Sequence, residues 1–395
     1  GAIPKRACGR QAGLRTGVPG AMSINPDAAL RRRALATALA AGLAAGAATY
    51  AFLRWASADA GSQDPRLQVG PAAKREPTEE EKEALEAALT GRDAETKAPC
   101  CIKSLFIYPV KSLKGIEVSS AKLEPEGFEH DRRWMVIDSK GTFMSQRRNA
   151  HMALVSPRIL SGGDGGVVLE LSSPTMDHSI QVAVNTSQSA AREEPVRVWD
   201  DYITGAFDQG NAAAAWIAQA IRQPGVRLVY MSTSCTRQVS QKHALSEEDR
   251  TAFSDGFPYL LISQASLNEL NRRVFERHGE LFKGGFLMSR FRPNIVVSGF
   301  GPFEEDDLAS ITVSGATKLC IVKPCARCKI TTVDQETGTA PRSLKVEPLL
   351  TLRDFRAQGD DVMFGQNLIW DNSLAPDGPV QISVGDPVTK VGKQD

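Results

Sequence analysis

The chain has 395 residues, of which 42% are apolar and 24% are charged, an ordinary globular composition with room for two domains. Its formal net charge of +1 gives no reason to expect a nucleic-acid partner. Seven cysteines are an odd number in a long chain, which argues against a secreted disulfide framework and favours free thiols in a reducing compartment.

The N-terminal segment, residues 1–33, is rich in arginine and has Asp27 as its single acidic residue. This composition is typical of an organelle-targeting segment, and a disordered basic tail fits equally well. Residues 34–53 carry no charge and are long enough to cross the hydrocarbon core as a helix. With basic anchors on both sides, residues 34–55 are predicted to form a transmembrane helix. An amphipathic targeting helix or a soluble alanine-rich helix remains open.

A polar linker with one short helix is predicted for residues 56–99, where Thr78 and Glu81 form a capping box. Short apolar runs separated by turn residues follow, and they predict a β-barrel or sandwich over residues 100–225. Its expected strands are 102–110, 116–123, 133–137, 142–146, 167–171, 180–184, 196–199 and 203–207, followed by a helix at 212–222 that Asn211 would cap.

A second domain of mixed elements is predicted for residues 226–392. Ser263 is the expected N-cap of a helix over 264–278, in which apolar residues recur on one face. Residues 238–257 are expected to form a loop with a short helix. The predicted strands are 226–231, 295–297, 311–313, 317–322, 329–333, 380–384 and 388–391.

Cys325 and Cys328 are predicted to lie on a short turn between strands 317–322 and 329–333, beside Arg327. Positive charge close by suits a thiolate ligand. Three interpretations are open. The pair could be half of a zinc site, although the sequence lacks a second ligand pair at zinc spacing. It could be a redox pair, which normally opens a helix in a βαβ unit, or one metal-binding cysteine beside a packing neighbour.

Several motifs resemble, in the same order, those of one protein family. They are residues 108–115 (YPVKSLKG), 131–134 (DRRW), 253–258 (FSDGFP), 291–297 (FRPNIVV), 323–328 (KPCARC) and 364–367 (FGQN). On these motifs the chain resembles the MOSC family, and within it the branch of mitochondrial amidoxime-reducing enzymes. The resemblance implies a β-rich α+β fold. A MOSC N-terminal β-barrel-like domain would precede a MOSC β-barrel domain, with a cofactor in the cleft between them.

The family implies a molybdenum cofactor, in which a pterin dithiolene and a single protein cysteine hold the metal. By this resemblance Cys325 is the metal ligand, and Cys328 is a packing residue. Asp255 would accept hydrogen bonds from the pterin ring and would act with Cys325 in catalysis. Residue types suited to the pterin phosphate are Lys111, Ser112, Arg132, Arg292 and Asn294.

The resemblance further implies reduction of N-hydroxylated compounds, such as amidoximes and hydroxylamines, at a mitochondrial membrane, the outer one in the family. No Gly-x-Gly-x-x-Gly motif opens a helix after a strand, so electrons would come from a partner. In the family this partner is a cytochrome b5 with its NADH-dependent reductase.

Two other functions remain open. The chain could be an accessory subunit of a larger membrane complex, because Ala38, Gly42 and Gly46 have the spacing of a helix-docking face. It could instead transfer sulfur, as the cofactor sulfurase does, although the sequence shows no pyridoxal-phosphate domain.

Overall fold

A computed structural model describes residues 98–393, apart from 163–165, 185–194, 233–234, 236, 283, 340–343, 345 and 376–377. The predicted basic segment 1–33, the transmembrane helix 34–55 and nearly all of the linker 56–99 lie outside the described residues. In the part of the chain that the structure describes, no helix is both long and apolar enough to cross a membrane.

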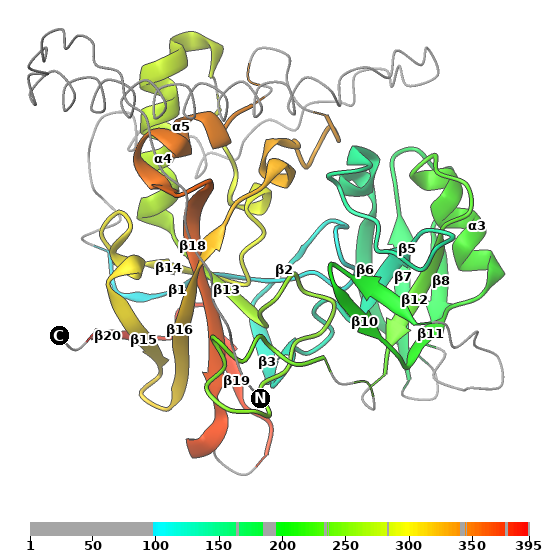
Figure 1. Ribbon diagram of the computed structural model, residues 1–395, viewed down its shortest axis with the longest axis horizontal. Coiled ribbons are helices and arrows are strands. Elements are labelled where there is room, and N and C mark those ends of the chain that lie inside the picture. Colours follow the sequence, from blue (N-terminus) through cyan, green and yellow to red (C-terminus); the bar gives the residue numbers. More distant parts are fainter. Residues whose placement is uncertain are drawn as a thin grey trace, which may run out of the picture. The chain divides into compact units, whose positions relative to one another are not determined.

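The largest of the β-sheets has nine strands, and Figure 1 shows most of them with their labels. Strands β13 and β14 run parallel, and the other neighbours run antiparallel. The strand order is β2 (Ile116–Val118), β1 (Cys101–Ile107), β14 (Ile295–Ser298), β13 (Tyr259–Ser263), β18 (Asp361–Asp371), β16 (Thr317–Ala326), β15 (Leu308–Val313) and β20 (Val388–Gly392), with β17 (Ala357–Gln358) paired to β18.

The strand ladders of this sheet do not close into a barrel within the described residues. A single bridge between Cys101 and Pro387 joins the start of β1 to the residues just before β20. Beside it, the Ile102 amide donates to the Asp386 carbonyl at 2.9 Å. The Gly385 amide donates to the Ile102 carbonyl at 2.8 Å, and the Val388 amide donates to the Cys100 carbonyl at 2.8 Å. The barrel expected for the second domain is therefore an open sheet in the described residues, and these backbone hydrogen bonds alone cross between the start of β1 and the segment that leads into β20.

Smaller sheets make up the rest of the β-structure. In one of them, residues 134–137 pair with the strand that follows helix α3 (Asn211–Ala220), and α3 packs against that strand. The smaller sheets are β11 (Ala206–Asp208), β12 (Arg227–Met231) and β5 (Trp134–Ile137); β6 (Ser156–Ser161), β7 (Val167–Ser172) and β8 (Ile180–Ala183); β9 (Val196–Val198) and β10 (Asp201–Ile203); and β19 (Gln381–Ser383), β3 (Ser120–Glu124) and β4 (Gly127–Phe128).

The predicted strand 329–333 is wrong, because a 3₁₀ helix, η7 (Lys329–Thr332), occupies these residues. Thr331 Oγ1 donates to the Cys328 carbonyl at 3.0 Å, and Thr332 Oγ1 donates to the Lys329 carbonyl at 2.8 Å. Such short-range side-chain bonds offer the backbone a turn instead of a ladder. The cysteine turn is also shorter than predicted, since β16 continues through Cys325.

Other differences from the prediction concern both strands and helices. Residues 142–146 form two isolated bridges rather than a strand, and residues 238–257 contain no helix. Strands β6, β13 and β18 and helix α5 (Leu349–Arg356) were not predicted.

Helix α4 (Gln264–His278) confirms the predicted range, and Ser263 is its N-cap. Ser263 Oγ accepts from the Ser266 amide at 3.0 Å. Next to this cap lies the fully buried carboxyl of Glu305, which accepts from Ser266 Oγ at 2.8 Å and from the Ser263 amide at 3.2 Å. Burial raises the pKa of Glu305 to about 7, although these hydrogen bonds lower it.

Stability should therefore fall as pH rises past the ordinary pKa of Glu305, 4.5, toward about 7. Because the folded state holds this proton more tightly, its contribution is complete below pH 4.5 and is lost as pH rises through 7. We expect Glu305→Gln to flatten this part of the pH profile, removing roughly 3 kcal/mol of pH dependence in urea unfolding between pH 5 and pH 8.

The matched control is Glu304→Gln. Lys390 and a backbone amide lower the pKa of Glu304 despite its partial burial. Glu304 is thus ionised in both states above pH 5, and its substitution should leave the slope in this window unchanged. An equal slope in wild type and Glu305→Gln would show that Glu305 does not hold its proton.

Candidate functional site

Cys325 lies at an irregularity near the end of β16. The ladder with β18 shifts register between Pro324 and Ala326, which leaves Cys325 at the shift. Such bulges re-aim side chains and are frequent beside active sites. Arg327 Nη1 donates to Cys325 Sγ at 3.0 Å, and Arg327 Nη2 donates to the Phe291 carbonyl at 2.6 Å. A guanidinium held from behind thus faces the sulfur, an arrangement that suits a negatively charged sulfur ligand.

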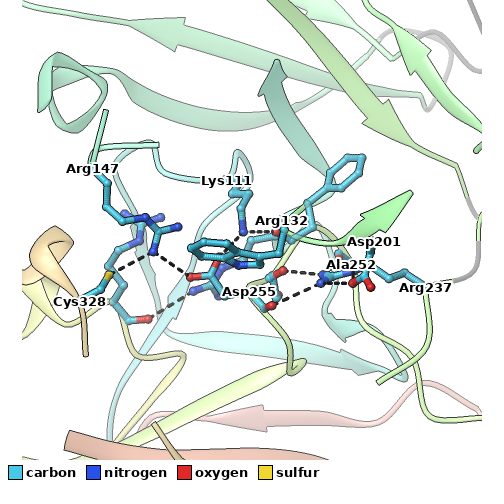
Figure 2. A network of polar contacts seen from close by, with 12 residues as sticks. Lys111, Arg132, Arg147, Asp201, Arg237, Ala252, Asp255 and Cys328 are labelled. Atoms are coloured by element: carbon cyan, nitrogen blue, oxygen red, sulfur yellow. Dashed lines mark hydrogen bonds and ion pairs between the residues drawn. The ribbon is translucent and has the colours of Figure 1, made fainter. Parts of the chain in front are cut away.

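Cys328 has a different partner. Arg147 Nη1 donates to Cys328 Sγ at 3.1 Å, and the same nitrogen lies 3.8 Å from Asp255 Oδ2 (Figure 2). The Arg147 guanidinium also lies over the Trp199 ring, 4.4 Å from its centroid. Cys328 is therefore part of a polar network, whereas the sequence predicted only a packing role for it.

Lys111 lies in the loop after β1 and is buried. Its ammonium donates to the Phe253 carbonyl at 2.7 Å and to Asp255 Oδ1 at 2.6 Å. Burial lowers the pKa of Lys111 to about 8, although the ion pair with Asp255 opposes this. The next residue, Ser112, has a φ of +66°, and its carbonyl accepts from Gln146 Nε2 at 3.0 Å.

Asp255 carries the negative charge of this cluster, and 59% of its side chain is exposed. Partial desolvation would raise its pKa, but Lys111 and Arg147 outweigh that effect and hold the pKa of Asp255 well below its usual range. The loop that presents Asp255 is fixed by the buried Arg237, which donates to the carbonyls of Ala252 and Ser254 at 3.1 and 2.6 Å (Figure 2). The carboxylate is thus ionised, partly open to solvent and rigidly placed.

Tyr108 is the centre of a second cluster, which contains the two predicted arginines. The guanidinium of Arg132 lies 4.4 Å from the Tyr108 ring centroid, and that of Arg292 lies 4.2 Å from it. Arg132 Nη1 donates to Asp131 Oδ2 at 2.5 Å and to Asn294 Oδ1 at 2.9 Å. Burial lowers the pKa of Arg292 to about 10. Arg292 is therefore charged at neutral pH, and hydrogen bonds and ring contacts hold both arginines in fixed positions.

The two clusters are linked by contacts. The Phe253 amide donates to the Arg132 carbonyl at 3.0 Å, while the Phe253 carbonyl accepts from Lys111. Arg292 Nη1 donates to the Leu113 carbonyl at 2.6 Å, in the loop that carries Lys111 and Ser112. Arg132 Nη2 also donates to the Arg292 carbonyl at 3.3 Å, and Arg327 joins the neighbouring Phe291 to Cys325. The structure thus brings together residues from every motif. In motif 364–367, Gln366 and Asn367 pair with Pro324 and Lys323, and the Phe364 ring centroid lies 4.6 Å from that of Phe291. The Gln366 side chain donates to Asp306 and has a structural role. The predicted site residues placed in these clusters are Cys325, Asp255, Lys111, Ser112, Arg132, Arg292 and Asn294.

Strain and unpaired polar atoms gather at the same place. Ser112, Arg132 and Arg292 all have positive φ, of 66°, 50° and 58°, a conformation that non-glycine residues rarely adopt. In the part of the chain that the structure describes, the buried Tyr108 Oη and Arg327 Nε have no hydrogen-bond partner. Backbone strain and unpaired buried donors are both typical of a site built for a ligand.

The donor set fits the molybdenum cofactor that the motifs imply. Cationic side chains outnumber carboxylates in the two clusters, which suits a phosphate-bearing ligand, and one cysteine sulfur is available as a soft metal ligand. The cations are Lys111, Arg132, Arg147, Arg292 and Arg327, and the carboxylates are Asp131 and Asp255.

Three residues of this site were missed by sequence reasoning. Arg147, Arg237 and Trp199 lie outside the matched motifs or in ordinary strand and loop sequence, where a charged or aromatic residue is unremarkable. Their importance comes from partners far away in the chain, such as Cys328, 181 positions from Arg147. No local pattern in the sequence marks them.

The chain belongs to the MOSC-domain family. Residues 100–224 match the MOSC N-terminal beta barrel domain, and residues 248–389 match the MOSC domain.

Among individual relatives, the chain is 32% identical to mitochondrial amidoxime-reducing component 1 of Mus musculus over 74% of this chain and 82% of that protein. It is 32% identical to mitochondrial amidoxime reducing component 2 of Homo sapiens, over 65% of this chain and 72% of that protein. It is 28% identical to the Homo sapiens molybdenum cofactor sulfurase, over 82% of this chain but 35% of that longer protein.

Proposed function

We propose that the protein is a molybdenum-cofactor oxidoreductase that reduces N-hydroxylated compounds. The observation that carries the proposal is the position of Cys325, whose sulfur is faced by Arg327 and connected by contacts to the buried Arg292 and the half-buried Arg132. The relatives named amidoxime-reducing components, about 30% identical over most of the chain, support this substrate class.

Each residue of the two clusters has a role in this proposal. Cys325 would ligate the metal, and Asp255 would accept hydrogen bonds from the pterin ring through its exposed oxygen surface. The strained loop at Ser112 would turn its amide and hydroxyl toward the ligand. Phosphate and pterin oxygens would be held by Lys111, Ser112, Arg132, Arg292 and Asn294.

The reaction consumes two electrons and two protons, converting R–NH–OH to R–NH₂ and water. The bound cofactor would supply the two-electron oxygen chemistry. The chain would supply orientation and proton control. Lys111, with a pKa of about 8, holds a proton at neutral pH beside the ionised Asp255 and can exchange it over a range close to neutrality.

Electrons would come from a cytochrome b5-type donor and its NADH-dependent reductase. The names of several relatives support a mitochondrial location. We propose the outer membrane on the family resemblance of the motifs. The predicted helix at 34–55 would tether the protein there, and shared anchoring would raise the encounter rate with membrane-bound donors.

The test uses the full chain from a host that makes the molybdenum cofactor. We expect about one molybdenum per chain by metal analysis, as a single thiolate site implies. We expect NADH-driven conversion of benzamidoxime to benzamidine that requires cytochrome b5 and its reductase. Protein without molybdenum would overturn the proposal in favour of an accessory scaffold. Molybdenum without amidine formation would overturn the proposed substrate class.

A further inference from the structure

The turn of the β9–β10 hairpin carries an aromatic residue in a strained conformation. Val198 pairs with Asp201, so the turn consists of Trp199 and Asp200. Trp199 has a φ of +56°. Two-residue hairpin turns with positive φ at the first central position favour glycine there, because a side chain crowds the backbone. A bulky indole at this position is a conformational outlier, and such outliers concentrate at functional sites.

The indole is held in place on several sides. The Arg147 guanidinium lies 4.4 Å from its ring centroid, and the Phe143 ring meets it edge-on with centroids 5.2 Å apart. Trp199 Nε1 donates to Asp255 Oδ1 at 3.3 Å. Even so, 45% of Trp199 is exposed. A large aromatic surface is therefore fixed in one orientation and open to solvent.

This surface borders the candidate cofactor site. Asp255, which accepts from the indole, is the ion-pair partner of Lys111. Arg147, which stacks on the indole, donates to Cys328, three residues beyond Cys325. A small molecule that reaches Cys325 past these residues would meet the indole.

We propose that Trp199 forms the wall of a substrate-binding subsite that selects planar π-systems, so that aromatic N-hydroxylated compounds bind in preference to alkyl ones. The inference rests on the proposed function and assigns the substrate class of the same site. Stacking on a ring that is already immobilised costs little additional side-chain entropy. The guanidinium of Arg147 fixes the indole orientation, and a flat π-system can make more contact with the exposed part of the ring than a branched alkyl group can.

The experiment compares two ligands that share a head group, benzamidoxime and acetamidoxime. Their binding to the full-length, cofactor-loaded protein is measured by calorimetry with no electron donor present, so that no turnover occurs. Trp199→Asn removes the ring but keeps a residue that tolerates positive φ. We expect it to weaken benzamidoxime binding about three- to tenfold, from the strength of one aromatic stacking contact, and acetamidoxime binding less than about twofold.

Two further variants separate stacking from structural damage. Trp199→Phe keeps an aromatic face and should recover most of the benzamidoxime affinity. Tyr202→Ser removes a 72%-exposed aromatic residue from the same hairpin and should change neither affinity. Equal losses for both ligands in Trp199→Asn would overturn the inference, because they would indicate a structural role. Wild-type protein that binds neither ligand would overturn it as well.

Molybdenum content is measured in every variant. A loss of molybdenum in Trp199→Asn would assign the ring to cofactor binding and would also overturn the inference. The failure of the two proposals can be told apart. Absence of turnover in wild type contradicts the proposed reaction. The subsite is tested by the ratio of the two affinities, which is measured without turnover.

Discussion

Cys325→Ser should abolish molybdenum binding while leaving the fold intact. Removal of the proposed metal ligand should cost more than the 10- to 100-fold typical of residues that merely support a ligand, so the proposed amidoxime reduction should fall by more than about 100-fold. Stability should change little, because the half-buried Cys325 side chain contacts chiefly Arg327. Metal analysis, steady-state reduction and urea unfolding measure the three effects.

Cys328→Ser is the matched control for this substitution. Cys328 is also half-buried and also accepts from a guanidinium, but its partner is Arg147 in the N-terminal part. We expect this variant to retain molybdenum at close to one atom per chain. If the two variants lose molybdenum equally, the assignment of the metal to Cys325 alone is wrong.

Arg132→Met should destabilise the fold itself. Asp131 is 1% exposed, and Arg132 supplies its ion pair, while the Tyr108 amide supplies a further hydrogen bond at 2.7 Å. Removal of one member of a buried pair leaves an uncompensated carboxylate and costs about 3–5 kcal/mol. The free energy of unfolding in urea measures this loss, and molybdenum content should fall with it because Arg132 is also a proposed cofactor ligand.

The double variant Asp131→Asn/Arg132→Met tests the cause of the instability. It removes the stranded charge, so it should be more stable than Arg132→Met alone by at least about 1 kcal/mol. Burial raises the pKa of Asp131, and Arg132 opposes this shift, so loss of the guanidinium should destabilise the ionised carboxylate further. A double variant as unstable as the single one would mean that Arg132 acts mainly through its contact with Tyr108.

Local signals were sufficient for much of the fold. The helix at Gln264–His278 was predicted from the Ser263 cap and its apolar face, both of which depend on neighbouring residues. Strand β13 was missed because all five of its residues are buried, so it shows no alternation. Strand β18 was missed because Gly365 and polar residues interrupt it, although its pairing with both β13 and β16 stabilises it.

The candidate residues of the site could be predicted from the sequence, but their arrangement could not. Residues such as Cys325 and Arg292 lie inside motifs whose order marks a family. The arrangement of these residues could not be read from the sequence, because Arg132 and Asn294 meet across 162 positions and Lys111 and Asp255 across 144. The strained turn at Trp199 was also invisible, since a short β-run that ends in tryptophan is typical of a strand and not of a turn.

The topology of the larger sheet has a consequence for the order in which the chain can assemble. Strand β1 can pair with β14 only after β14 has been synthesised, since Cys101 pairs with Ser298. Strands β16 and β13 are not neighbours, because β18 lies between them. While the ribosome is still synthesising residues 361–371, β13 and β16 each have an unpaired edge, a state prone to aggregation. The sheet around Cys325 is therefore completed late, after the β5–β12 pairing can already form. A cofactor that binds at this site would therefore enter it only after nearly the whole chain has been synthesised.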